Sequence, residues 1–347
     1  MKNKQVNSQL QTESRFRSWL VPHKISLLIV WLVTTITMIV MLMNGVGGTS
    51  RYNAVRHTLH VLYLMALFWH LARTGPKFDQ LPRLNPPVLL RWKFGAWLPV
   101  LGIALLFALN LFSDDGWDLL ILLSAVASVV VLVVWLSDIR LGLVIQGITV
   151  ATFAYLTGLQ FVKIGVLSES WNTILSAFTL PFYIAGGLLF KRTGLGGMQL
   201  LNGKYREVLK SVFFGCLLFV PLGLFNAFGG SSVDTSSVRQ WWIPFWLPWW
   251  SGLNEETWFR LYLVGLIYFL MRPAFRKFPN LVVIAAVLFS GITFGVGHDR
   301  TLEGFLTTGL LYGVPFAAVF AKRDWEHAVG AHYMVNLIPT VVTFLQR

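Results

Sequence analysis

The stretch ISLLIVWLVTTITMIVMLM, residues 25–43, contains no charged residue over 19 positions. About 20 predominantly apolar residues are enough for an α-helix to cross the hydrocarbon core of a bilayer. This stretch therefore predicts a membrane-spanning helix. The 24 residues before it are polar and mixed, unlike the short basic segment that precedes the apolar core of a signal peptide, so we expect the stretch to be retained as a first helix.

Ten more apolar runs follow along the chain. They cover residues 54–71, 94–112, 119–136, 141–162, 171–190, 212–228, 255–271, 281–297, 302–320 and 328–344. Over the whole chain 55% of the residues are hydrophobic and 12% are charged, whereas a soluble domain has about 25% charged residues. These features exclude an ordinary soluble protein. They predict an all-α, polytopic transmembrane helical bundle with about eleven spans.

The formal net charge is +13, and the positions of the basic residues relative to the apolar runs indicate how the chain is oriented in the membrane. If the N-terminus is cytoplasmic, 21 of the 28 Lys and Arg residues fall in cytoplasmic segments. Cytoplasmic loops of membrane proteins carry this excess of Lys and Arg. We therefore predict an N-in orientation, with the lipid bilayer and its anionic head groups as partners of the basic residues and with no nucleic-acid partner.

Ionisable residues inside predicted spans mark three candidate functional segments, because a charged side chain at the centre of a bilayer costs about 2.5–3.5 kcal/mol on insertion scales. The segments are NEETWFR at residues 254–260, FGVGH at 294–298 and HYMVN at 332–336. In the first segment, Glu256 and Arg260 are four residues apart, so on a helix they can form an ion pair. Glu255 points about 100° away from Glu256 on the same helix. Its carboxylate is thus free to face another element.

The other two segments supply imidazole and amide groups. His332 and Asn336 are four residues apart and lie on one face of a second helix, while His298 ends a third predicted span. A free carboxylate, two imidazoles and an amide are together able to deprotonate a water molecule and to stabilise an oxyanion. Hydrolysis of an amide bond requires both steps.

The same side chains are also able to hold a divalent metal ion such as zinc, which would lower the pKa of a bound water. The candidate ligands are Glu255, His298 and His332. The helical zinc signature HExxH does not occur in the sequence. Cys216 is the only cysteine, which excludes an intrachain disulfide and a cysteine-based metal cluster. The sequence leaves open whether a metal ion or the carboxylate alone activates the water.

In this order and over 82 residues, the three segments resemble the motifs of the CAAX protease and bacteriocin-processing (CPBP) family of intramembrane endopeptidases. The eukaryotic CAAX prenyl endopeptidase is a member of that family. The matching positions are Glu255-Glu256-x-x-x-Arg260, Phe294-x-x-x-His298 and His332-x-x-x-Asn336. The resemblance covers residues 212–347, and the predicted spans before them contain no motif of this kind.

The resemblance implies an endopeptidase that hydrolyses peptide bonds in membrane-associated or lipid-modified polypeptides. By position, it implies that Glu255 and His298 activate the attacking water and that His332 and Asn336 stabilise the oxyanion. The ion pair within the first segment would be structural. The resemblance also implies an integral, multi-pass protein of a bacterial cell membrane, with a membrane-embedded or lipidated peptide or protein as its substrate.

Two alternatives from other functional classes stay open. One is a non-proteolytic membrane scaffold or bacteriocin self-immunity protein on the same fold. The other is a secondary transporter with a proton relay of buried Glu and His residues, for which the first six predicted spans offer few ionisable groups. We favour the endopeptidase because all three motifs are intact. We predict an accessory region of about six helices over residues 1–200 and a protease domain of about five helices over residues 205–347.

The segment WWIPFWLPWW, residues 241–250, contains five of the 15 tryptophans. Trp favours the membrane interface, and Pro244 and Pro248 are expected to prevent a long regular helix here. The segment therefore predicts an aromatic belt, a re-entrant element or a substrate-facing gate.

Glu255, His298 and His332 have to lie at a similar depth in the membrane if they are to form one site. Residues 239–272 would span about 50 Å as a helix, which is too long for a single crossing. We therefore expect part of residues 241–254 to lie within the membrane, which draws Glu255 toward the midplane.

Overall fold

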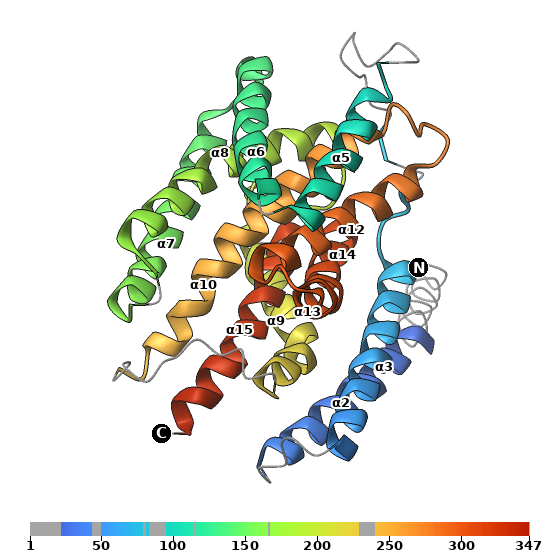
Figure 1. Ribbon diagram of the computed structural model, residues 1–347, viewed down its shortest axis with the longest axis vertical. Helices are drawn as coiled ribbons and strands as arrows, with labels where there is room; N and C mark the ends of the chain where they lie inside the picture. The colour runs from blue at the N-terminus through green and yellow to red at the C-terminus, as the bar shows by residue number, and fades with distance from the viewer. Residues whose placement is uncertain are drawn as a thin grey trace, which may run out of the picture. The chain divides into compact units, whose positions relative to one another are not determined.

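The computed structural model describes residues 22–43, 50–78, 81–82, 95–113, 115–165, 167–228 and 240–346. Every regular element in these ranges is a helix, which confirms the all-α prediction. The elements are α2 (Pro22–Met43), α3 (Ser50–Thr74), α5 (Leu98–Phe112), α6 (Asp115–Val134), η2 (Leu136–Asp138), α7 (Leu141–Lys163), α8 (Glu169–Thr193), α9 (Tyr205–Phe228), α10 (Ile243–Glu255), η3 (Glu256–Val264), α11 (Gly265–Met271), α12 (Pro279–His298), α13 (Leu302–Gly304), η4 (Phe305–Gly313), α14 (Val314–Lys322) and α15 (Trp325–Leu345) (Figure 1). Element η2 is a 3₁₀-helix, and η3 and η4 are π-helices.

The chain forms two compact units, Met1–Gly75 and Pro76–Arg347. In the first unit, α2 and α3 pack side by side (Figure 1). The second unit contains the helices from α5 to α15, and with them every candidate site residue. The division into an accessory region over residues 1–200 and a protease domain over residues 205–347 stays a prediction.

Within the part of the chain that the structure describes, eight helices are long and apolar enough to cross a membrane, which supports a polytopic membrane protein. They are Lys24–Met43, Gly116–Val134, Leu141–Lys163, Glu169–Thr193, Tyr205–Phe228, Pro279–His298, Phe305–Lys322 and Trp325–Leu345. The other three predicted spans fall on α3, on the shorter apolar helix α5, and on η3 with α11. The count of eleven spans therefore stays a prediction.

The orientation in the membrane also stays a prediction. Nine basic residues that enter the charge count lie outside the described residues, namely Lys2, Lys4, Arg15, Arg17, Arg83, Arg91, Lys93, Arg239 and Arg347.

Helices α10, η3 and α11 follow one another without a break over residues 243–271. Pro244 and Pro248 do not interrupt this run, contrary to the expectation that they prevent a long regular helix in the tryptophan-rich segment. Pro244 lies in the first turn of α10, where a backbone N–H has no partner within the helix, and Pro248 removes a single hydrogen bond farther along. At 1.5 Å per residue the run is about 40 Å long. Glu255 and Glu256 lie near its middle.

Close approaches between helix backbones position the two helices that carry the candidate imidazoles. Helix α9 packs along α15, where a Cβ atom on Gly330 would overlap the backbone of Val212. Helix α12 packs on η4, where a Cβ atom on Gly295 would overlap the backbone of Gly309. Small residues allow the backbones of membrane helices to approach in this way. The positions of α12 and α15 therefore depend on these glycines.

Replacing Gly330 by alanine tests the α9–α15 contact. We expect Gly330→Ala to lower the free energy of unfolding by about 1–3 kcal/mol, because the new methyl group meets rigid backbone and overpacks the contact. Gly102→Ala in α5 is the matched control, since a Cβ atom there meets no atom within 4 Å. Unfolding in detergent measures both variants. Equal stability of the two would contradict the contact.

Candidate active site

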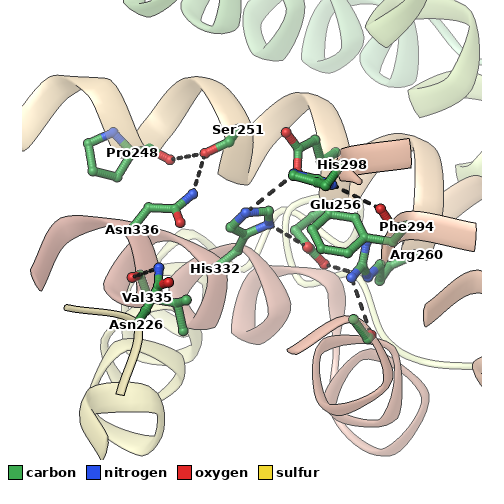
Figure 2. Close-up of polar contacts among 12 residues, drawn as sticks. Asn226, Pro248, Ser251, Glu256, Arg260, Phe294, His298, His332, Val335 and Asn336 are labelled. Atoms are coloured by element: carbon green, nitrogen blue, oxygen red, sulfur yellow. Dashed lines mark hydrogen bonds and ion pairs between the residues drawn. The ribbon is translucent and has the colours of Figure 1, made fainter. Parts of the chain in front are cut away.

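Three separate helical segments of the second unit meet at the candidate site (Figure 2). The junction of α10 and η3 carries Glu255 and Glu256, the end of α12 carries His298, and α15 carries His332 and Asn336. The condition that the three motifs meet in space is satisfied, because both imidazoles lie within 4 Å of the Glu255 carboxylate.

Glu256 and Arg260 form a buried ion pair next to the candidate catalytic residue Glu255. Oε2 of Glu256 lies 3.3 Å from Nε of Arg260, and both side chains are fully buried, which confirms the predicted pair. Arg260 also donates from Nη2 to the backbone oxygen of Gly313 in η4 at 3.2 Å. Its guanidinium carbon lies 4.3 Å from the ring centre of Phe294 and 5.4 Å from that of Phe316. Aromatic faces attract a cation at such distances, so several elements compensate one buried charge.

The local backbone differs from the regular α-helix that the spacing assumes. Residues Glu256–Val264 form the π-helix η3, whose hydrogen bonds join residues five apart. Such segments are rare and occur frequently at functional sites. The ion pair between Glu256 and Arg260 forms nonetheless.

Glu256 also orients His332. Nδ1 of His332 lies 2.7 Å from Oε1 of Glu256. Because a carboxylate only accepts, Nδ1 carries the hydrogen and donates it. The ring stacks on Phe316 with a centroid distance of 4.8 Å and an interplanar angle of 11°. These contacts direct Nε2 toward Glu255, whose Oε2 lies 3.6 Å away.

His298 approaches the same carboxylate from α12. Its Nδ1 donates to the backbone oxygen of Phe294 at 2.9 Å, so Nε2 of the neutral ring carries the lone pair. That nitrogen lies 3.7 Å from Oε2 of Glu255. The His298 side chain is 44% exposed, compared with 3% for His332. His298 is therefore the more exposed of the two imidazoles.

Oε2 of Glu255 thus lies between two imidazole nitrogens without a hydrogen bond to either. It is buried, and it has no hydrogen-bond partner among the described residues. Distances of 3.6 and 3.7 Å exceed those of direct hydrogen bonds but are suitable for a bridging water. This arrangement is able to bind a water molecule against a carboxylate base.

Asn336 lies one turn beyond His332 and points to a different partner. Its Nδ2 donates to Oγ of Ser251 at 2.8 Å, and Ser251 in turn donates to the backbone oxygen of Pro248 at 3.3 Å (Figure 2). Sequence reasoning missed Ser251, although its position four residues before Glu255 was a usable signal. The contact fastens α15 to α10 beside the carboxylate.

A cavity of about 220 Å³ opens beside Glu255 and His298. Its remaining lining is Trp117, Ile121, Trp171, Leu175, Phe178, Thr179, Phe182, Trp250, Asn254, Trp258, Phe259 and Gly297. Seven of these residues are aromatic. Helices α6 and α8 contribute seven of these twelve residues, although the sequence motifs lie entirely in later helices. Scattered tryptophans and phenylalanines in apolar helices carry no spacing signal that would have identified them.

The donor geometry does not favour a metal ion. Among the described residues, no group of three or more His, Cys, Asp or Glu side chains is arranged to hold one. Nε2 of His298 and Nε2 of His332 lie 3.7 and 3.6 Å from Oε2 of Glu255.

Comparisons with protein-family models, with curated proteins and with solved structures found no match for this chain.

Removing only one partner of the buried ion pair should destabilise the protein strongly. We expect Arg260→Met to lower the free energy of unfolding by about 3–5 kcal/mol, because it leaves the Glu256 carboxylate buried without its cation. The double variant Glu256→Gln/Arg260→Met should recover much of this loss, since no charge is left unpaired. Unfolding curves in detergent measure both. Additive losses in the double variant would contradict the pairing.

Proposed function

We propose that this protein is an intramembrane endopeptidase that hydrolyses peptide bonds in membrane-associated or lipid-modified polypeptides. The observation that supports this most is the Glu255 carboxylate, which lies between two imidazoles at the edge of an apolar cavity. The order of the three motifs, which resembles that of the CPBP family, is the second support. The excess of basic residues in the predicted cytoplasmic segments favours an N-terminus in the cytoplasm, and the resemblance to the CPBP family favours a bacterial cell membrane.

The first chemical step is attack by water. A water molecule in the gap donates one hydrogen to Oε2 of Glu255 and the other to Nε2 of His298, which aims an oxygen lone pair at the scissile carbonyl. As the new C–O bond forms, Glu255 takes a proton and the carbonyl π electrons move to the oxygen. The product of this step is a tetrahedral oxyanion.

The second step breaks the peptide bond. The oxyanion reforms the carbonyl, the C–N bond breaks, and the proton held by Glu255 passes to the leaving nitrogen. One water is consumed, and the products are a carboxylic acid and an amine. In its protonated form His332 donates from Nε2 to the oxyanion while its Nδ1–H remains bonded to Glu256, which stabilises the imidazolium as an acidic partner does in other hydrolases.

The cavity favours an uncharged, bulky substrate residue beside the scissile bond. Apart from Glu255 and His298, its polar lining is limited to a hydroxyl, an amide and indole N–H groups. A charged substrate side chain would be desolvated there without a partner, which is costly.

The replacements Glu255→Gln and His298→Ala test the assignment. With reconstituted protein and a library of apolar membrane peptides, we expect wild type to cleave and each variant to lose about 10²–10⁴-fold in kcat, because each lacks a group that binds or deprotonates the water. Glu207→Gln removes an exposed carboxylate on α9 and should retain full activity. Activity that survives a chelator supports carboxylate-activated water.

Two results would overturn the proposal. One is the absence of cleavage by folded wild type, which would favour a scaffold or self-immunity protein. The other is equal cleavage by wild type and Glu255→Gln.

A further inference from the structure

Each of the five residues 254–258 has a buried polar side-chain atom without a hydrogen-bond partner, and three of these atoms belong to residues that line the cavity. These three are Nδ2 of Asn254, Oε2 of Glu255 and Nε1 of Trp258. All three residues line the cavity. Buried polar groups in folded proteins are nearly always hydrogen-bonded, so a cluster of unsatisfied ones calls for a ligand. The cluster offers two donors and one acceptor.

The side chain of Asn254 is held in one orientation by α8. The hydroxyl of Thr179 donates to Oδ1 of Asn254, which leaves the amide nitrogen Nδ2 as the unsatisfied group. Asn254 itself is 6% exposed. Its donor is therefore fixed next to Glu255 without competition from bulk water.

The indole ring of Trp258 is held by aromatic neighbours. It stacks on Phe182 with a centroid distance of 5.7 Å and an interplanar angle of 8°, and Trp117 lies 5.6 Å away. Trp258 follows Asn254 by four residues on the continuous run from α10 into η3, so the two side chains lie on one side of it. Both donors thus belong to residues that line the same cavity as Glu255.

This donor and acceptor pattern is complementary to a peptide carbonyl under attack by water. The water donates to Glu255, and the carbonyl oxygen, which gains negative charge, accepts two N–H bonds. Nδ2 of Asn336 by contrast already donates to Ser251.

We propose that Asn254 and Trp258 are further catalytic residues whose side-chain N–H groups bind the carbonyl oxygen of the substrate in the transition state. Thr179 is a positioning residue that acts through Asn254. The inference rests on the proposed peptide hydrolysis and adds an oxyanion site at two positions of the first segment to which the resemblance assigns no role.

The test compares variants that remove one N–H group without adding a charge. Asn254→Leu keeps the approximate size of the side chain, and Trp258→Phe keeps an aromatic ring in the stack. We expect each to lower kcat by about 100-fold with little change in KM, because the lost bond forms only in the transition state. Thr179→Val should lower kcat less, and Thr179→Ser should restore it. Thr257→Val is the matched control, since it removes a buried, unsatisfied hydroxyl of the same helix outside the cavity lining.

A phosphonamidate peptide, which mimics the tetrahedral intermediate, gives a readout besides turnover. Its affinity should fall in Asn254→Leu and Trp258→Phe by the same factor as kcat/KM. If wild type cleaves but both variants retain kcat and analogue affinity within a few-fold, the oxyanion site is overturned and the hydrolase stands. If folded wild type neither cleaves nor binds the analogue, both proposals fail.

Discussion

The guanidinium of Arg260 places a positive charge where water does not reach, and much of the site is arranged around that charge. Its compensation comes from the carboxylate of Glu256, a backbone oxygen of η4 and the faces of aromatic rings. A buried ion pair contributes little net stability, but loss of either partner is costly because it leaves the other charge buried and unpaired. The second oxygen of Glu256 binds His332. The pair, which lies in the π-helix η3, therefore orients His332, one imidazole of the candidate active site.

Helix packing supplies the rest of the geometry. Glycine contacts bring α15 against α9 and α12 against η4. As a result the neutral ring of His298 presents its lone pair, and the ring of His332 its Nε2, to the same oxygen of Glu255. Adjacent residues thus have separate tasks: Glu256 faces inward and is neutralised, whereas Glu255 faces the cavity and keeps an unsatisfied oxygen.

The sequence was informative wherever one spacing rule decides the outcome. Apolar runs predicted the helices, and a separation of four residues predicted the pair between Glu256 and Arg260. The π-helical backbone and the helix through Pro248 depend on packing against other elements and were not predicted. The aromatic residues that α6 and α8 contribute to the cavity lining were also not predicted, because the sequence of an apolar helix does not distinguish a tryptophan that faces lipid from one that faces a cavity. The catalytic roles of Glu255, His298, His332 and Asn336 stay predictions.

The central claim is that water bound at Glu255 attacks the peptide carbonyl directly. Cleavage of a membrane peptide in ¹⁸O-labelled water, with mass spectrometry of both the products and the protein, tests it most directly. The account predicts one solvent oxygen in the new carboxylate after a single turnover, with no acyl group on the protein and no hydroxamate when hydroxylamine is added. A hydroxamate or an acylated protein would contradict direct attack, and an uncut peptide would contradict hydrolysis altogether.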